Sequence, residues 1–186
     1  MKKHVLPSML ILLFLGIALI SFCLYAYKHP FLPAPPSVIK KESEQTATVS
    51  GVEAFVEHVV DGDTIDVMID NQKTPIRLIG INAPEKYAGK DPECFAGEAY
   101  QYVKQRIEDR QIVLVADISQ ENKDKYERLL RYVLLPDGTN LNLELIEKGY
   151  AREYTYKVPY QYQQEFRSAQ ETAKKQAVGL WTSCYK

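Results

Sequence analysis

Three short stretches of this 186-residue chain combine carboxylate, amide and guanidinium groups that could do chemistry together. The stretches are Asp61-Gly62-Asp63-Thr64, Arg77 with Asn82-Ala83-Pro84-Glu85, and Asp124-Lys125-Tyr126-Glu127-Arg128. Clustered oxygen ligands suit Ca²⁺ or Mg²⁺ better than a transition metal, and two arginines can each fork onto a phosphate. Phosphodiester hydrolysis needs such groups together with a positioned water. Each stretch alone also has a plain structural reading, because Asp-Gly-Asp is common in turns and an arginine at a strand end is usually a surface group.

Composition excludes several other classes of protein and of site. The chain is 46% apolar and 25% charged, ordinary globular values that exclude a collagen-like, disordered or multi-span membrane protein. His58 is the only histidine after the N-terminal region, which excludes mechanisms that need two histidines, and the sequence has no Cys-x-x-Cys pair. From Ala47 onward 18 basic groups face 22 acidic groups. Nucleic-acid binding would therefore depend on a local basic patch, not on a general cationic coat.

Three regions follow one another along the chain. Residues 1–28 are expected to be a membrane anchor or signal, because residues 5–27 carry no charge and can cross a bilayer. The lack of a good small-x-small cleavage site favours an uncleaved anchor; a cleaved signal peptide and a lipoprotein modified at Cys23 are the alternatives. Residues 29–46 hold four of the ten prolines and are expected to form an extended tether. Residues 47–186 form one domain without internal repeats.

The location of that domain follows from the flanking charges only in part. The basic groups on the two sides of the apolar segment are nearly balanced, so the positive-inside rule does not decide the orientation. The short basic N-terminal tail and the cysteines favour a domain outside the cytoplasm, tethered to the membrane. Cleavage of the segment would instead give a secreted protein.

Apolar patterning predicts a mainly β domain with helices. Strands are expected at 52–60, 64–69, 74–81, 111–117 and 129–135, separated by turn residues. Helices are expected at 97–109, 141–148 and 160–177, where apolar residues recur at helical spacing or capping residues flank the segment. Five strands with one helix after the third and two at the end suit a small closed β-barrel packed by helices.

Taken in order, the motifs are far more specific than any one of them. The sequence D-G-D-T, then R-L-I-G-I-N-A-P-E, then G-E-A at 97–99, D-K-Y-E-R and G-L-W closely resembles the staphylococcal (micrococcal) nuclease family, the thermonucleases, over residues 50–183. The resemblance implies an α+β, mainly β fold, a five-stranded OB-fold barrel packed by three helices. It also implies a Ca²⁺-dependent nuclease that acts on DNA and RNA and leaves 3′-phosphate ends. We expect a monomer, and no protein partner is predicted.

The resemblance also implies roles for individual residues. Arg77, Glu85 and Arg128 match the catalytic residues of the family, and Asp63 matches a calcium carboxylate. Asn82 stands where a second calcium carboxylate is expected, and Ala83 would contribute only its backbone carbonyl. Tyr126 matches a family position near the substrate phosphate, and Tyr154 and Tyr156 resemble a tyrosine-bearing segment that packs nucleotide bases. Such rings stack on bases without sequence preference; the alternative is that these tyrosines are ordinary core or surface residues.

Two positions depart from the family pattern. Asn82 keeps an oxygen ligand but removes one negative charge, so weaker or broader metal use is expected. Glu127 replaces the glycine that usually precedes the second arginine. If its side chain points to solvent it is harmless, whereas pairing with Arg128 would compete with the phosphate.

Cys94 lies just before the first helix of the domain and Cys184 just after Trp181. In an exported domain a disulfide between them would pin the C-terminal helix to the barrel. Two free thiols in a reducing cytosol are the alternative.

Two other functions compete with the nuclease. A catalytically inactive OB-fold module that binds nucleic acid or protein would typically lack the arginines and the glutamate. A purely structural envelope anchor has only the apolar segment in its favour. Because the domain is acidic, substrate binding is expected to be weak and to fall less steeply with salt than in a basic nuclease.

Overall fold

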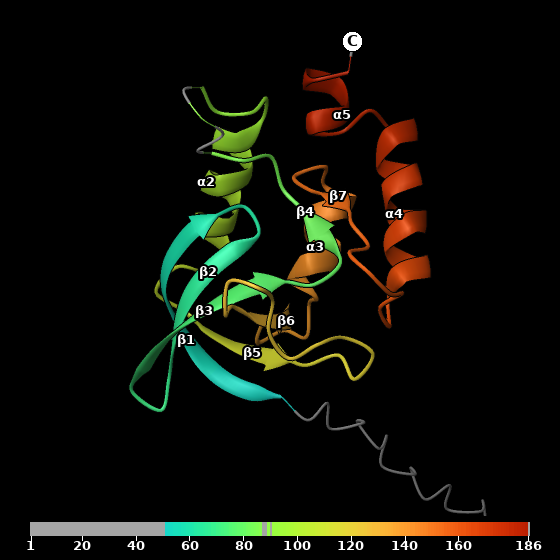
Figure 1. Ribbon diagram of the computed structural model, residues 1–186. Helices are drawn as coiled ribbons and strands as arrows, with labels where there is room; N and C mark the ends of the chain where they lie inside the picture. The colour runs from blue at the N-terminus through green and yellow to red at the C-terminus, as the bar shows by residue number, and fades with distance from the viewer. Residues whose placement is uncertain (1–50, 87–88, 90, 186) are drawn as a thin grey trace, which may run out of the picture. The chain divides into compact units, whose positions relative to one another are not determined.

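The computed structural model describes residues 51–86, 89 and 91–185 (Figure 1). Its centre is a closed barrel with the strand order β1-β2-β3-β6-β5. The barrel strands are β1 Val52–Asp61, β2 Thr64–Ile69, β3 Gln72–Leu78, β5 Gln111–Val115 and β6 Leu129–Leu134. All neighbouring strands are antiparallel except β3 and β6, whose parallel pairing closes the barrel. The predicted five-stranded barrel is confirmed.

The backbone conformation of the turns sets where the barrel strands begin and end. Asp70 and Asn71 both have positive φ values, and β3 therefore starts at Gln72, two residues earlier than predicted. At its other end β3 stops at Leu78, because Gly80 has a φ of 78° that breaks the extended conformation. The predicted continuation of this strand to Ile81 is wrong.

A second, two-stranded sheet follows this break, and sequence patterning did not predict it. Strand β4 (Ile81–Asn82) pairs with β7 (Arg152–Glu153), and Asn82 stands opposite Arg152. Each strand has only two residues, which is too short for any periodicity to show. The sheet carries Asn82 toward the ends of β2 and β3, where Asp63 and Arg77 lie.

Four helices surround the strands in the described part of the chain. They are α2 Ala96–Ile107, α3 Leu141–Glu147, α4 Gln163–Lys175 and α5 Leu180–Ser183. The first three confirm the predicted helices, with α4 shorter at both ends, and α5 is an additional single turn. Helix α3 is capped by the Asn140 side chain, which accepts hydrogen bonds from two backbone N–H groups of the first turn.

The core lies inside the barrel and under the helices. The largest fully buried side chains come from the barrel strands β2, β3, β5 and β6, from β4, and from α2, α3 and α4; they include Ile65, Ile76, Ile107, Leu145 and Phe166. Helix α2 also approaches the site-bearing turn closely: a Cβ added at Gly62 would lie 2.6 Å from Ala83 Cβ and 3.2 Å from Ala99 Cβ. Only glycine fits at this crossing.

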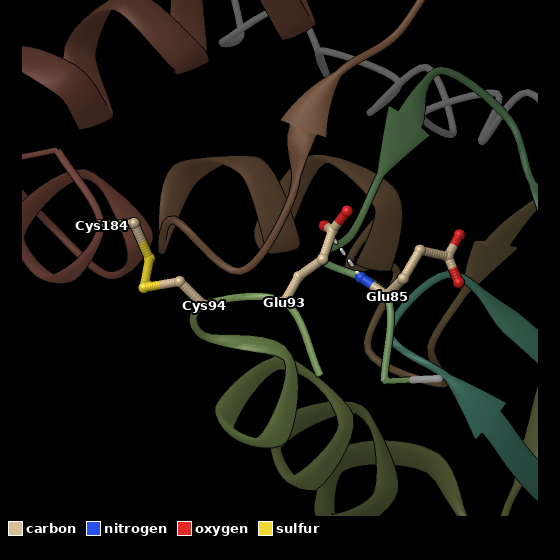
Figure 2. The surroundings of a disulfide bond; sticks show 4 residues. All are labelled: Glu85, Glu93, Cys94 and Cys184. Carbon is tan, nitrogen blue, oxygen red and sulfur yellow. Dashed lines mark hydrogen bonds between the residues drawn. A yellow bond between two sulfur atoms is a disulfide. The ribbon is translucent and has the colours of Figure 1, made fainter. Parts of the chain in front are cut away.

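The predicted disulfide is present. Cys94 and Cys184 are joined, with their Cα atoms 5.9 Å apart, and the bond links the start of α2 to the end of α5 (Figure 2). The predicted anchor and tether, residues 1–46, lie outside the described residues. No helix among the residues that the structure describes is both long and apolar enough to span a bilayer.

Candidate active site

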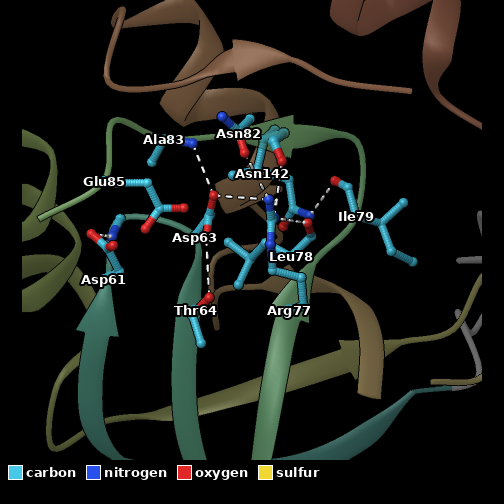
Figure 3. A network of polar contacts seen from close by, with 12 residues as sticks. Asp61, Asp63, Thr64, Arg77, Leu78, Ile79, Asn82, Ala83, Glu85 and Asn142 are labelled. Atoms are coloured by element: carbon cyan, nitrogen blue, oxygen red, sulfur yellow. Dashed lines mark hydrogen bonds and ion pairs between the residues drawn. The ribbon is translucent and has the colours of Figure 1, made fainter. Parts of the chain in front are cut away.

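Asp63 is the centre of the polar network at the open end of β2 and β3 (Figure 3). Asp63 is only 5% exposed. Asp63 Oδ2 lies 2.9 Å from Arg77 Nη2 and accepts the Ala83 N–H at 2.9 Å, while Oδ1 accepts the Thr64 hydroxyl at 3.0 Å. One buried carboxylate therefore joins residues from β2, β3 and the segment after β4.

Arg77 is held by the backbone of the turn that follows it. Its Nη1 donates to the carbonyls of Leu78 at 2.8 Å and Ile81 at 2.9 Å, and its Nη2 donates to Asn82 Oδ1 at 3.2 Å. A planar guanidinium with several occupied donors has little rotational freedom. The break at Gly80 is what folds these carbonyls back toward Arg77.

Arg128 enters the same network from the loop before β6. Asp124 Oδ2 contacts both Arg128 Nε, at 2.7 Å, and Nη2, at 2.6 Å, and Arg128 Nη1 donates to Thr64 Oγ1 at 3.2 Å. Burial alone would raise the pKa of Asp124, but hydrogen bonds from the Arg128 side chain and from two backbone N–H groups hold it below its ordinary value. Thr64 thus connects Arg128 to Asp63.

Glu127 does not compete for Arg128. Its side chain is 80% exposed and pairs with Lys123 at 3.0 Å, which confirms the expectation that it points to solvent. Its φ of 64° lies in the left-handed region, where a side chain is unfavourable. This conformation explains why glycine is the usual residue at this position of the family pattern.

Glu85 and Asp61 extend the network with two more carboxyl groups. Figure 3 shows Asp61, Asp63 and Glu85 turned toward one another. Desolvation, the hydrogen bond with Asp61 and the charges of Asp61 and Asp63 raise the pKa of Glu85 to about 7, against the opposing charge of Arg77. Asp61 also accepts the backbone N–H groups of Gly62 and Lys86. Its place in the site was not predicted individually, although the Asp-Gly-Asp motif contained the signal.

The donor set of the network suits a hard cation. Within the described ranges no group of three or more histidine, cysteine, aspartate and glutamate residues has the arrangement of a metal site. Carboxylate, amide and backbone carbonyl oxygens are nevertheless the ligands that Ca²⁺ takes in proteins, and Asp63, Asn82 and Ala83 supply all three kinds. Ala83 is itself buried, so its methyl group points into the core.

The three predicted tyrosines are exposed beside the network. The Tyr126 ring is covered by Lys125 Nζ at 4.9 Å and by Arg128 Cζ at 5.2 Å. Tyr154 and Tyr156 lie side by side, with ring centroids 6.4 Å apart. The Tyr154 N–H donates to the Gly80 carbonyl at 2.9 Å, which attaches this segment to the turn that holds Arg77. The structure therefore places Tyr126 against Arg128 and joins the Tyr154 segment to the turn at Gly80, whereas Tyr156 contacts Tyr154.

Comparisons with known proteins agree with this arrangement. A family model described as staphylococcal nuclease homologue matches residues 75–183. A thermonuclease of Staphylococcus hyicus is 30% identical over 185 residues, covering 98% of this chain and 100% of that protein. A thermonuclease of Staphylococcus intermedius is 32% identical over 139 residues, 74% of this chain and 81% of that protein.

A longer relative matches the same domain. Endonuclease YhcR of Bacillus subtilis is 35% identical over 162 residues, which cover 81% of this chain but only 13% of that enzyme. The barrel topology, the ordered site residues and the family match agree, and the chain belongs to the staphylococcal nuclease homologue family.

Proposed function

We propose that this protein is a Ca²⁺-dependent nuclease that hydrolyses phosphodiester bonds of DNA and RNA and leaves 3′-phosphate ends. The observation that carries the proposal is the convergence of Arg77, Arg128 and Glu85 around Asp63. Relatives named thermonuclease and endonuclease support it. A binding module without activity would have no need of two oriented guanidinium groups beside a carboxylate cluster.

Each side chain has a role that its surroundings support. Arg77 and Arg128 would bind the two sides of the scissile phosphate and neutralise charge that grows on its oxygens. Glu85 would orient the attacking water or take its proton. Tyr126, Tyr154 and Tyr156 would carry the neighbouring nucleotides by stacking.

Asp63, Asn82 and Ala83 would hold the cation through a carboxylate, an amide oxygen and a backbone carbonyl. Bound Ca²⁺ supplies Lewis-acid stabilisation of the phosphate and a template for the water. With an amide at position 82 the site has one charge fewer, so we expect weaker Ca²⁺ binding than two carboxylates would give.

We further propose that residues 5–27 tether the nuclease to the membrane with its domain outside the cytoplasm. Their uncharged length and the Cys94–Cys184 disulfide, which suits an oxidising compartment, support this location. Retention of the full chain in the membrane fraction, with nuclease activity of intact cells toward added DNA, tests it. A soluble chain shortened at its N-terminus would show cleavage and secretion instead.

The activity is tested with the purified full chain on single-stranded DNA and on RNA, with Ca²⁺ or with a chelator. We expect cleavage that needs Ca²⁺ and that is lost in Glu85→Gln and Arg128→Ala. Glu98→Gln and Arg110→Ala serve as matched controls, because both residues are exposed and lie outside the network. Products that accept a 5′-phosphate label without prior dephosphorylation would support cleavage that leaves the phosphate on the 3′ side.

The opposite result would be equally informative. If the wild type binds nucleic acid yet does not cut it with Ca²⁺, Mg²⁺ or Mn²⁺, the proposed activity is refuted. The inactive OB-fold binding module would then be the function of this domain.

A further inference from the structure

The backbone of Glu85 is joined to Glu93 in both directions (Figure 2). The Glu85 N–H donates to Glu93 Oε2 at 3.1 Å, and the Glu93 N–H donates to the Glu85 carbonyl at 2.9 Å. The two glutamates are eight positions apart in sequence. These two hydrogen bonds tie the peptide groups of Glu85 to Glu93.

Further hydrogen bonds restrain this stretch of backbone on either side of Glu85. Upstream, the Ala83 N–H is fixed on Asp63 at 2.9 Å, and Pro84 has no N–H to donate. Downstream, the Lys86 N–H reaches Asp61 Oδ2 at 3.3 Å. Glu93 is thus the residue whose contacts fall on the Glu85 peptide groups themselves.

Glu93 is exposed, so water competes for its hydrogen bonds and they would be weak if the residue were free to move. The next residue, Cys94, is covalently bound to Cys184. Cys184 in turn follows α5, whose first residue Leu180 is fully buried and donates its N–H to the Gly149 carbonyl at 2.9 Å. The disulfide therefore attaches Glu93 to a packed part of the domain that lies outside the barrel.

We propose that Glu93 is a positioning residue for Glu85 and that the Cys94–Cys184 disulfide keeps Glu93 in place. The proposal rests on the proposed function, in which Glu85 acts on the attacking water. Loss of the Glu93 carboxylate leaves the Glu85 N–H without its acceptor and keeps only the backbone hydrogen bond from the Glu93 N–H to the Glu85 carbonyl, so the Glu85 carboxyl group samples positions away from the water. The disulfide serves activity as well as stability, and reduction of it weakens catalysis before the domain unfolds.

The first test compares substitutions of Glu93 by steady-state kinetics on single-stranded DNA. Glu93→Ala is expected to lower kcat by roughly 10-fold or more, because small misplacements of a reacting group cost up to about 100-fold, and to leave KM within about two-fold. Glu93→Gln keeps an oxygen acceptor and is expected to retain activity within about three-fold of the wild type. Glu98→Ala is the control for removal of an exposed glutamate, here one in the first turn of α2.

Two results would overturn the proposal here. Equal losses in Glu93→Gln and Glu93→Ala would assign the effect to charge and not to the hydrogen bonds. Unchanged kcat in Glu93→Ala would show that Glu85 needs no such support.

The second test is a cycle with the variant Cys94→Ser/Cys184→Ser, compared at a temperature at which all variants are folded. If the disulfide acts through Glu93, its removal lowers kcat in the wild type and has little further effect in Glu93→Ala. Independent, multiplying losses would contradict the link between the two.

Hydrogen exchange of the Glu85 amide separates the proposal from the proposed function. We expect this amide to be protected in the wild type and to exchange faster in Glu93→Ala and in the double serine variant, whether or not the protein cuts nucleic acid. Unchanged exchange in both variants refutes the positioning role of Glu93. Absence of Glu85-dependent cleavage with faster exchange refutes only the proposed function.

Discussion

The Thr64 hydroxyl touches both halves of the candidate site. It donates to Asp63 Oδ1 at 3.0 Å and accepts from Arg128 Nη1 at 3.2 Å. Thr64→Val keeps the shape of the side chain and removes both hydrogen bonds. The variant therefore isolates the contribution of this connection to stability and to the orientation of Arg128.

The two lost hydrogen bonds contribute unequally to the free energy of unfolding. The Arg128 side chain is 26% exposed and keeps two contacts with Asp124, so water can replace the missing partner at little cost. The Asp63 side chain is only 6% exposed, and its Oδ1 loses its hydroxyl donor. A hydrogen bond to a charged group contributes about 1.5–3 kcal/mol, so we expect Thr64→Val to lower the free energy of unfolding by about 2–3 kcal/mol.

Thr64→Ser is the matched control, since it keeps the hydroxyl and loses one methyl group, a cost of about 1 kcal/mol. Urea unfolding measures stability, and cleavage of single-stranded DNA measures kcat. We expect kcat to fall roughly 10-fold in Thr64→Val because Arg128 is less well oriented, which corresponds to an activation free energy higher by about 1.4 kcal/mol. In Thr64→Ser we expect kcat to stay near the wild-type value. Equal stability and equal kcat in the two variants would refute the connecting role of the hydroxyl.

Three further predictions follow from other contacts. Burial alone would raise the pKa values of Asp117 and Glu144, but hydrogen bonds hold both below their ordinary values of 3.8 and 4.5. The ionised carboxylates therefore stabilise the fold fully above those ordinary values. This stabilisation is lost as the pH falls through the lower pKa values of the folded state. Acid unfolding curves of Asp117→Asn and Glu144→Gln should therefore be flatter below pH 4 than that of the wild type, and parallel curves would contradict this. Glu127→Gly should raise the free energy of unfolding by about 1 kcal/mol in urea titrations, because φ is positive there, and a loss of stability would show that the Lys123 pair matters more. Asn142→Ala should lower the free energy of unfolding by about 3 kcal/mol or more, because the buried Asn142 side chain donates to the Ile79 and Arg131 carbonyls and accepts the Val133 N–H. A loss below about 1 kcal/mol would show that water replaces the missing amide.

The chain order of Asp63, Arg77, Glu85 and Arg128 was enough to predict the family and the candidate site. Residue types at fixed spacing carry this information because phosphate and a hard cation accept few kinds of ligand. Alternation of apolar residues likewise indicated the five barrel strands, since burial of one face imposes a period of two residues. Cys94 and Cys184 could be paired because the domain has no other cysteine.

Local features of the site could not be read in the same way. The β4–β7 sheet is formed by two residues from each strand, and its pairing joins segments about seventy residues apart. No local sequence pattern therefore predicts it. Gly80, whose left-handed conformation precedes the Ile81 carbonyl that binds Arg77, lies against the buried Tyr160 ring, and the Tyr160 hydroxyl donates to the Gly80 carbonyl at 3.2 Å from eighty residues away.

Sequence alone determined which chemistry this chain can perform, because that depends on the kinds of side chain present and on their order. Only the tertiary structure decided how they are held: Thr64 joining Arg128 to Asp63, Asp61 beside Glu85, and Glu93 with its disulfide behind the Glu85 backbone. These contacts join separate elements, and their geometry is set by the packing of α2 against the barrel and by the disulfide that ties the start of α2 to α5. Positioning is therefore a property of the whole fold, whereas the reactive groups are written in short stretches of sequence.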